Sequence, residues 1–419
     1  MPVVRLFAVF RTPRMAVLFA LGWSSGIPLY LTGLTLQAWL TELGVSLDRI
    51  AAVPLMGLAY TLKFLWAPVL DRFQLPLLGR RRGWMLTLQV LLVVAIAALG
   101  MCDPIGAPNT LVAMAMIVAL LSASFDVVLD AYNADLLAPH ERAAGSAAYV
   151  LGYRTAMVTT GALALVLADH LTWPAIYGVM AALMVIGIVA TLLAEEPAPG
   201  GRRLASFGEA LYRPFVELWH RLGPRTLALV LAFTAVYKFG DHFAQVLVIT
   251  FLKRGAGFEY TEIAAIYQVL GLAGTALGGM TAGILVSRFG LPRMLVAFGV
   301  LQSVTNLLYA ALAAAASGDA LWLFSTAVLV DNLANAMGTA AFLALLMSVC
   351  SPAVSATQLA LLTSLSSVGQ RVFGPFAASV VEAADWTGFF AITSALAIPG
   401  IVLAAVVSRQ KFAHSPASS

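Results

Sequence analysis

Apolar residues fill long runs of this chain, and short polar segments separate the runs. A helix needs about 20 such residues to cross the hydrocarbon core of a bilayer. Runs of this length predict twelve membrane-spanning helices near residues 15–40, 49–70, 84–102, 109–133, 143–168, 171–194, 225–251, 261–286, 294–316, 319–349, 353–381 and 386–407. The pattern therefore predicts an all-α integral membrane protein.

One long polar connection divides these spans into six and six. We expect an N-terminal six-helix bundle at 1–194, a cytoplasmic linker at 195–224, a C-terminal bundle at 225–409 and a short tail at 410–419. Apolar residues recur near helical spacing within the linker, which favours an amphipathic helix at the membrane surface, whereas Pro214 favours a plain linker. These apolar positions are Phe207, Leu211, Phe215, Leu218, Trp219 and Leu222.

A weak internal repeat relates the two halves. The segment 70–73, Leu-Asp-Arg-Phe, recurs as Val-Ser-Arg-Phe at 286–289, and the segment 152–154, Gly-Tyr-Arg, recurs as Gly-Gln-Arg at 369–371. The two offsets are 216 and 217 residues. Near-equal offsets predict a duplicated six-helix unit, as in transporters built from parallel repeats.

Composition and charge support a membrane location. Hydrophobic residues make up 61% of the 419 positions and charged residues only 11%, whereas soluble domains average about 25% charged residues. Most lysines and arginines fall in the segments that are cytoplasmic if the N-terminus lies inside, and the outer loops hold only Arg49, Lys253 and Arg254. This bias predicts that both termini are cytoplasmic. The uncharged run from Met15 to Thr41 is too long for a cleaved signal and is expected to remain as the first span.

The other residue types indicate neither metal nor nucleic-acid chemistry. Cys102 and Cys350 form no CxxC motif and no ligand pattern with the five histidines, so neither a metal site nor a disulfide is expected. The net charge of +4 arises in loops and does not indicate nucleic-acid binding. We expect a monomer in a lipid bilayer that needs no cofactor other than a proton gradient.

Eight ionisable side chains fall within the predicted spans. A charge at the centre of a membrane helix costs about 2.5–3.5 kcal/mol on insertion scales, so these groups must face one another or a hydrated cavity. A polar cavity through a membrane protein indicates passage of a polar solute. The eight are Lys63, Asp126, Asp130, Arg154, Lys238, Asp241, Asp331 and Arg371.

Asp126 and Asp130 are the candidates for proton coupling. They are four residues apart, which places them on one face of the fourth helix. In a poorly solvated cavity, burial and mutual repulsion favour proton capture by at least one of them near neutral pH. We hypothesise that Asp126 carries the proton; alternatively, it forms a static ion pair with Arg154 or Lys63. Asp130 lies nearer the cytoplasmic end and is equally well interpreted as a solvated helix-end charge.

Candidate substrate contacts are distributed over both halves. Lys238 and Asp241 are three residues apart, so a local ion pair is the default interpretation. A functional interpretation has equal weight: Lys238 or Arg371 receives a carboxylate of the cargo, while Asp241 and His242 orient it. The complete set of expected substrate contacts is Gln37, Tyr60, Lys63, Arg154, Lys238, Asp241, His242, Asp331 and Arg371.

The loop after the second span is a candidate gate. Asp71 and Arg72 precede a run of three arginines, Arg80, Arg81 and Arg82. Either these arginines simply hold the loop inside by their charge, or Asp71 and the nearby cations form a breakable latch between the halves. In the eighth span, the pairs Gly274/Gly278 and Gly279/Gly283 are expected to permit close helix packing.

Several segments together resemble a known family. They are Gly33-Leu-Thr-Leu-Gln-Ala-Trp39, Lys63-Phe-Leu-Trp-Ala-Pro68 through Arg72, Gly79-Arg-Arg-Arg-Gly-Trp84, Ser122-Ala-Ser124 with Asp126, Asp130 and Ala131, Leu151-Gly-Tyr-Arg154, Tyr237-Lys238 with Gly240-Asp241, and Ser355-Ala-Thr-Gln358 through Gly369. In type and order they look like the AmpG-type muropeptide permeases of the major facilitator superfamily, over nearly the whole chain. The resemblance implies a major facilitator fold with two six-helix halves.

The resemblance also implies a function. Members of this family import anhydromuropeptides by proton symport across the bacterial inner membrane, for peptidoglycan recycling and, through the imported signal, β-lactamase induction. The two carboxylates of the fourth span carry over to Asp126 and Asp130. Phe125 stands where the family has glutamine and Asn133 where it has lysine, so the resemblance leaves the exact cargo open.

Other functions remain open from the sequence. One is a major facilitator carrier for another anionic solute, such as an acetyl-CoA-like compound or a small peptide. Another is a prenyltransferase-like membrane enzyme, which the pair Asp126 and Asp130 superficially suggests, although the second half offers only isolated Asp331 as a further acidic site. A third is a scaffold or sensor that keeps the fold without transport. The chain contains no P-loop, so an ATP-driven pump is not expected.

Overall fold

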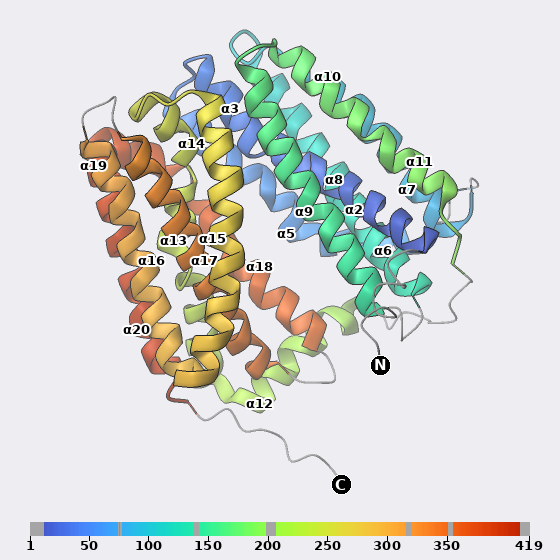
Figure 1. The fold of residues 1–419 in the computed structure, drawn as a ribbon. Helices are drawn as coiled ribbons and strands as arrows, with labels where there is room; N and C mark the ends of the chain where they lie inside the picture. The colour runs from blue at the N-terminus through green and yellow to red at the C-terminus, as the bar shows by residue number, and fades with distance from the viewer. Residues whose placement is uncertain are drawn as a thin grey trace. The chain divides into compact units, whose positions relative to one another are not determined.

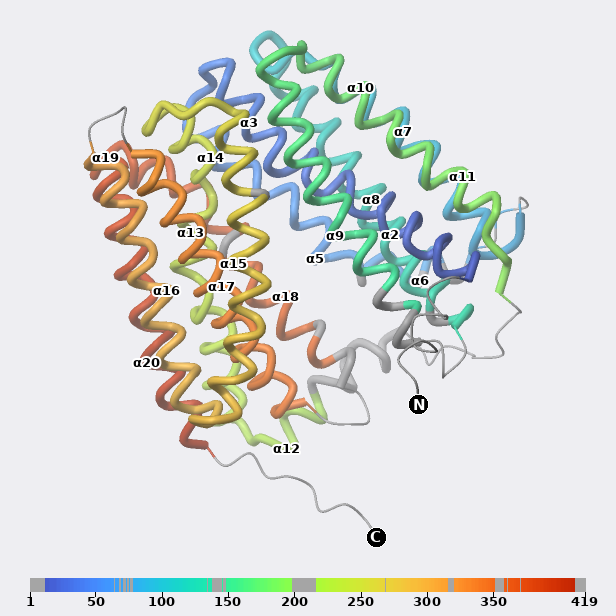
Figure 2. Tube along the Cα trace, viewed as in Figure 1, coloured from blue at the N-terminus to red at the C-terminus, as the bar shows by residue number. Residues whose placement is uncertain are grey.

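The computed structural model describes residues 12–73, 75, 78–137, 142–197, 207–315, 320–350 and 355–410. Regular structure in these residues is helical, and the described part of the chain contains no strand (Figure 1; Figure 2). Ten helical stretches of the described residues are long and apolar enough to cross a membrane. The all-α membrane class predicted from the apolar runs is therefore confirmed, and the ten stretches are compatible with twelve spans.

The chain divides into two compact units. Unit 1 comprises Met1–Val45, Leu55–Arg203 and Glu259–Ala264. Unit 2 comprises Ser46–Pro54, Leu204–Phe258 and Ala265–Ser419. Residues 46–54 therefore belong to unit 2, although the residues on both sides of them belong to unit 1. Residues 259–264 belong to unit 1, although the residues on both sides of them belong to unit 2.

Unit 1 is built mainly from long helices that begin at glycine or proline. Gly79, with φ at 94°, precedes α7, and proline occupies the first turns of α2, α8 and α10. Proline suits this position because the first turn of a helix has no partner for its N–H groups. Helix α2 packs against α9, α11 and α8, and α7 packs against α8, α10 and α11. The helices are α2 (Pro13–Leu31), α3 (Leu34–Glu42), α7 (Arg80–Gly100), α8 (Pro108–Leu136), α9 (Arg142–Ala168), α10 (Trp173–Leu183) and α11 (Val185–Leu193).

The second predicted span is helical but is not one regular helix. Its residues form five short helices, α4 (Leu47–Ala51), η2 (Val53–Gly57), α5 (Leu58–Leu62), η3 (Lys63–Leu65) and α6 (Ala67–Arg72). Pro54 lies inside η2 and Pro68 in the first turn of α6. Because proline cannot donate the backbone hydrogen bond that continues a helix, these residues divide the apolar run.

Unit 2 repeats the same construction. Helix α16 packs against α17, α19 and α20, α12 packs against α18 and α20, and α13 packs against α18, α19 and α16. Helix α15 begins in the segment that belongs to unit 1. The helices are α12 (Phe207–Val236), α13 (Phe239–Gln245), α14 (Val248–Thr250), η4 (Phe251–Gly255), α15 (Tyr260–Phe289), α16 (Leu291–Ala314), α17 (Leu321–Val349), α18 (Ser355–Phe373), α19 (Phe376–Leu396) and α20 (Ile398–Val407).

Several breaks interrupt the long helical runs of unit 2. Helix α12 contains a non-helical residue, Gly223, so that its first part, Phe207 to Leu222, is a helix of the linker. Within this part Leu218 is buried and Trp219 is exposed, as an amphipathic helix requires. The predicted eleventh span, 353–381, is interrupted between Phe373 and Phe376. A kink at Asp385 precedes the last predicted span.

Glycines bring helices of the same unit into close contact. In unit 1, a Cβ at Gly152 of α9 would collide with the carbonyl oxygen of Phe19 on α2. In unit 2, a Cβ at Gly369 of α18 would approach the Phe239 ring of α13 to 3.1 Å. The repeated glycine of the fifth span therefore packs against the first span of its own half in both units.

The glycines of α15 differ from one another. A Cβ at Gly274 or Gly278 would collide with the backbone of α17, at Leu329 and Leu333 respectively. A Cβ at Gly279 or Gly283 would meet no atom within 4 Å. Only the first pair therefore serves close packing, and the prediction for the second pair was wrong.

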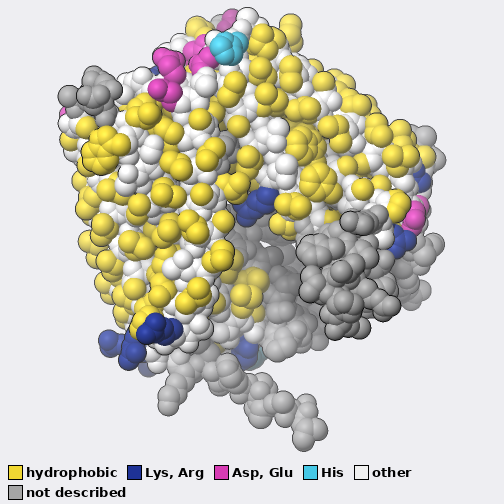
Figure 3. All heavy atoms as spheres, viewed as in Figure 1, with side chains coloured by type: hydrophobic (Ala, Val, Ile, Leu, Met, Phe, Trp, Pro, Cys, Tyr) yellow, Lys and Arg dark blue, Asp and Glu magenta, His cyan; other side chains and the backbone are white. Residues whose placement is uncertain are grey.

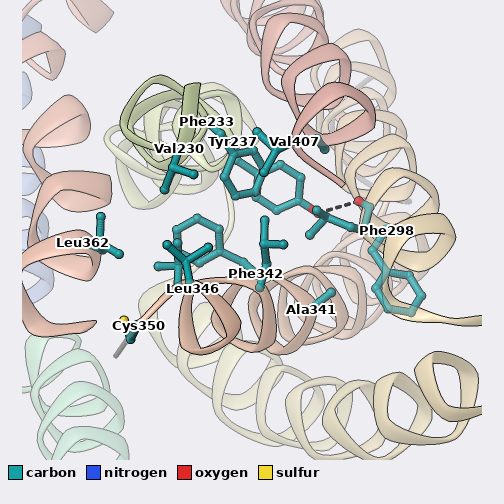
Figure 4. Packing of buried hydrophobic residues seen from close by; sticks show 14 of the residues in the cluster. Val230, Phe233, Tyr237, Phe298, Ala341, Phe342, Leu346, Cys350, Leu362 and Val407 are labelled. Atoms are coloured by element: carbon teal, nitrogen blue, oxygen red, sulfur yellow. Dashed lines mark hydrogen bonds between the residues drawn. The ribbon is translucent and has the colours of Figure 1, made fainter. Parts of the chain in front are cut away.

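An aromatic cluster fills the core of unit 2 (Figure 4). The Tyr237 and Phe342 rings stack with 5.7 Å between centroids and an interplanar angle of 4°, and Phe233 packs against both. The Tyr237 hydroxyl donates a hydrogen bond of 2.7 Å to the Leu295 carbonyl, so the polar end of this buried side chain has a partner.

The outer flank of unit 2 in Figure 3 is mostly hydrophobic, and Lys and Arg side chains lie at one end of it.

Candidate functional site

The fourth span of unit 1 places Asp126 in the interior. Asp126 lies on α8 and is 7% exposed. The Ser25 hydroxyl of α2 donates a hydrogen bond of 2.5 Å to Asp126 Oδ1. Neither Lys63 nor Arg154 lies within ion-pair distance of Asp126 in the described structure, and Lys63 is paired with Asp130. The described hydrogen-bond partner of Asp126 is thus a neutral donor. The role of Asp126 remains a prediction.

Asp130, one turn further along α8, has a different environment. Its side chain is 56% exposed, and Lys63 Nζ of η3 lies 3.4 Å from its Oδ2. Exposed ion pairs of this kind contribute about 0–1 kcal/mol to stability. Asp130 is therefore an ion-paired carboxylate at the surface of unit 1, whereas Asp126 is an interior carboxyl.

Unit 2 contains a buried ion pair on the seventh span. Lys238 Nζ lies 3.7 Å from Asp241 Oδ2, and the two side chains are 5% and 4% exposed. Asn335 of α17 donates a hydrogen bond to Asp241 Oδ2, and Lys238 donates one of 3.4 Å to the Asn335 carbonyl. The default interpretation of these residues, a local ion pair, is present in the structure.

Asp331, in the fourth span of unit 2, has only neutral hydrogen-bond donors. It lies on α17 and is 2% exposed. The Thr305 hydroxyl of α16 lies 3.1 Å from its Oδ1, and Gln245 of α13 donates a hydrogen bond of 3.2 Å to its Oδ2. No lysine or arginine of the described chain lies within ion-pair distance of Asp331. This environment resembles that of Asp126.

The two units therefore share an arrangement. Each contains one carboxylate that pairs with a lysine, Asp130 with Lys63 or Asp241 with Lys238. Each also contains one buried carboxyl, on its fourth span, that is bonded by neutral side chains from other helices of the unit. A carboxyl of the second kind is suited to gain and lose a proton, because no ion pair among the described residues fixes its charge.

The remaining predicted substrate contacts occupy varied positions. Gln37 is buried on α3, and the buried hydroxyl of Tyr60 on α5 has no hydrogen-bond partner of ordinary geometry among the described residues. Arg154 is exposed on α9. His242 and Arg371 are half-buried on α13 and α18, and His242 Nδ1 likewise lacks a described partner. These contacts remain predictions.

The arginines of the loop before α7 bind within unit 1. Arg81 Nε lies 2.9 Å from Asp135 Oδ2 at the end of α8. Arg82 donates hydrogen bonds to the carbonyls of Thr191 and Leu192 on α11. The Glu196 carboxylate accepts bonds of 2.9 and 3.0 Å from the backbone N–H groups of Arg81 and Arg82 and so caps α7.

These contacts show a structural role for Arg81 and Arg82 in joining α7 to α8 and α11. Arg80 is half-buried at the start of α7. The side chains of Asp71 and Arg72 lie outside the described structure. The gating function of this loop remains a prediction.

Sequence reasoning missed the neutral partners of the two buried carboxyls. These partners are Ser25, Thr305 and Gln245. All three are polar residues within apolar runs, which was an available signal, but many such residues only bond to their own helix. Thr234, for example, donates to the Val230 carbonyl. Among the described residues, no group of three or more His, Cys, Asp and Glu side chains is placed to hold a metal ion.

The fold matches solved membrane transporters. The chain aligns with a mutant of the nucleoside transporter NupG at a TM-score of 0.70 and 14% identity, covering 94% of this chain and 99% of that one. It aligns with a bacterial homologue of the human lysosomal transporter Spinster at a TM-score of 0.67 and 15% identity, covering 98% of both chains. Identities this low support the fold alone.

Similarity of sequence is much stronger to curated permeases. The chain is 44% identical over 408 residues to the anhydromuropeptide permease of Escherichia coli (strain K12), covering 97% of this chain and 82% of the relative. It is 29% identical over 411 residues to the putative transporter AmpG 4 of Rickettsia conorii, covering 96% and 98%. The family model described as Major Facilitator Superfamily matches residues 15–280. The chain therefore belongs to the major facilitator superfamily and, within it, to the family of AmpG-type muropeptide permeases.

Proposed function

We propose that this chain is a proton-coupled symporter that imports anhydromuropeptides, N-acetylglucosaminyl-anhydro-N-acetylmuramyl peptides, from the periplasm to the cytoplasm. It would act as a monomer in the bacterial inner membrane, with both termini in the cytoplasm. The imported compounds would enter peptidoglycan recycling and act as the signal for β-lactamase induction. The 44% identity to the Escherichia coli permease supports this cargo.

The charge of the cargo explains why a proton is needed. Moving one negative charge into a cell against a potential of about 100 mV costs about 2.3 kcal/mol. The peptide stem of a muropeptide carries carboxylates, so its import opposes the potential. Protons that enter with the cargo offset this cost.

The observation that carries the proposal is the environment of Asp126. This carboxyl is buried in the fourth span, accepts a hydrogen bond from Ser25, and has no ion-pair partner among the described residues. A buried carboxylate without a cation is costly, whereas the neutral acid is tolerated. Asp126 is therefore the group in unit 1 best suited to bind a proton on one side of the membrane and release it on the other.

Uptake by inner-membrane vesicles tests the cargo and the coupling. Vesicles that contain the chain should accumulate labelled anhydromuropeptide, and a protonophore should abolish the accumulation. Unlabelled acetyl-CoA and small peptides, added separately, should compete poorly. Absence of uptake would reject the cargo, and accumulation that ignores the protonophore would reject proton coupling.

Asp126→Asn separates proton binding from cargo binding. Because the amide cannot bind the proton, we expect gradient-driven accumulation to be lost while exchange of external labelled cargo for internal unlabelled cargo continues. The Asp48→Asn variant is the matched control, since Asp48 is an exposed carboxylate in the first turn of α4. Undiminished accumulation by Asp126→Asn would contradict the assignment.

A further inference from the structure

The Thr305 hydroxyl in unit 2 faces two oxygen atoms. Thr305 Oγ1 lies 2.8 Å from the Gln302 carbonyl oxygen and 3.1 Å from Asp331 Oδ1. A threonine hydroxyl has one hydrogen to donate and two lone pairs with which to accept. It therefore cannot make a strong, linear hydrogen bond to both oxygens at once.

Two arrangements satisfy this geometry, and they differ by one proton on Asp331. If Thr305 donates to Asp331, the carboxyl is a carboxylate and the Gln302 carbonyl loses that bond. The contact with the Gln302 carbonyl is the shorter one. If Thr305 donates its hydrogen there, the contact between Thr305 Oγ1 and Asp331 Oδ1 can be a hydrogen bond only if Asp331 carries the hydrogen. The hydroxyl thus fits both the charged and the neutral form of Asp331 after a simple rotation.

The charged groups around Asp331 favour this exchange. Lys238 and Asp241, from the start of the α13 segment, are already paired with each other at 3.7 Å. His242 follows on α13, and Tyr309 of α16 and Tyr267 of α15 contribute neutral hydroxyls that lie 3.4 Å apart. The second described hydrogen bond to Asp331 comes from the neutral amide of Gln245. A group only 2% exposed with no cation of its own is costly to keep charged.

Two further polar side chains lie on the same helix as Thr305. Gln302 and Asn306 flank Thr305 on α16 and are 4% and 1% exposed. Gln302 Nε2 and both polar atoms of the Asn306 side chain have no hydrogen-bond partner among the described residues. The face of α16 beside Asp331 is therefore polar, with amide groups that can take part in hydrogen bonds near this carboxyl.

Asp331 also resembles Asp126 in its environment, although the two do not align at the 216–217-residue offset of the repeat. Each is the buried carboxyl of the fourth span, and each accepts a hydrogen bond from the first span of its half, Asp126 from Ser25 and Asp331 from Gln245. We propose that Asp331 is a second proton-binding site, in unit 2, and that it takes up and releases one proton per transport cycle. This inference rests on the proposed function, because it assigns a second coupled proton to the same import.

The step is a simple proton transfer. An O–H bond forms at an oxygen of Asp331 with a proton from water on the outer side, and the carboxylate becomes a neutral acid. The same bond breaks when the group is open to water on the inner side, and the proton passes to that water. No other bond changes, apart from the rotation of the Thr305 hydroxyl.

The limiting accumulation ratio in proteoliposomes tests the number of protons. With the membrane potential clamped to zero, each proton coupled to import raises the ratio of internal to external labelled anhydromuropeptide about tenfold for a gradient of about one pH unit. We expect Asp331→Asn to lower this limiting ratio about tenfold, and Asp331→Glu, which keeps a carboxyl, to retain it. A purely structural role would slow uptake but leave the limiting ratio unchanged, and that result would overturn the proposal.

Infrared difference spectroscopy tests the site without any cargo. In spectra recorded between neutral and alkaline pH, the wild-type protein should lose the C=O band of a protonated carboxyl. The part of this band that belongs to Asp331 should be absent from Asp331→Asn and present in the Asp48→Asn control. It should move in frequency in Thr305→Val, which removes the hydroxyl partner. An Asp331→Asn spectrum identical to that of the wild type would overturn the proposal even if the cargo assignment had failed. A spectrum with the component missing, from protein that does not accumulate anhydromuropeptide, would support the proton site and reject the cargo.

Discussion

Among individual residues, the buried pair Lys238 and Asp241 differs most from the other charged groups. Both side chains are almost fully excluded from solvent, and Asn335 bonds to each of them. Burial of a single charge is strongly unfavourable, whereas a paired and hydrogen-bonded charge is tolerated. This geometry fits the structural interpretation of the pair, and cargo that binds either residue would have to disturb it.

Neutralisation of one or both charges separates the structural function from transport. Lys238→Met or Asp241→Asn alone leaves the other charge buried, so we expect each to destabilise the protein by about 3–5 kcal/mol. The double variant should recover most of this loss. Thermal unfolding of the purified protein measures the stability, and uptake of labelled anhydromuropeptide measures function. Additive destabilisation in the double variant would show that the two residues do not act as a pair, and recovered stability without uptake would indicate that the cargo binds this pair.

The sequence predicted the charged members of the site but not their partners. Charges within apolar runs are detectable because they are so unfavourable in lipid, which is how Asp126, Asp241 and Asp331 were found. Their partners depend on which helices touch. Lys63, one of the two alternative partners considered for Asp126, lies on the short helix η3 and pairs with Asp130. The serine, threonine and glutamine donors resemble the many polar residues that bond only to their own helix.

Between elements, glycine sets how closely α2 and α9 approach each other. Gly22 and Gly26 on α2 face the carbonyls of Tyr149 and Tyr153, and Gly152 on α9 faces the carbonyl of Phe19. Small residues permit such contacts, which membrane helices need because lipid provides no hydrophobic force between them. This contact also positions Ser25, on α2, beside Asp126.

Gly152→Val tests this contact. The added atoms would collide with the α2 backbone, so we expect a destabilisation of at least about 1–3 kcal/mol and loss of gradient-driven uptake. Gly178→Val is the matched control, because a Cβ at Gly178 on α10 would meet no atom within 4 Å. Thermal unfolding of both variants provides the measurement. Equal unfolding temperatures for the two variants would contradict the packing argument.

The positions of the spans followed from apolar run length, but their internal breaks did not. The run at 15–40 is broken between Leu31 and Leu34, where Gly33 leaves the helical conformation, and the last run is broken between Leu396 and Ile398, before Pro399. A run-length count averages over single glycines and prolines, so it does not register such breaks. Continuous runs without internal proline, such as 319–349, were predicted within two residues of α17.

For the whole molecule, orientation in the membrane is the property that function most depends on. A symporter that imports cargo must release its proton on the cytoplasmic side, and the proposed direction assumes that both termini lie there. The two cysteines offer a native test of this topology. Cys102 is the last residue of the third predicted span and should face outward, whereas Cys350 follows the tenth and should face inward.

Labelling of intact cells with a membrane-impermeant maleimide should modify Cys102 but not Cys350. Burial raises the pKa of both thiols, and only the thiolate reacts, so the rate should be low at neutral pH and should increase as the pH rises. Cys102→Ser should abolish labelling of intact cells, and Cys350→Ser should leave it unchanged; after denaturation each single variant should react at its remaining cysteine. Labelling of Cys350 in intact cells would mean that the chain is inserted in the opposite sense, and the direction of proton-driven transport would then be export.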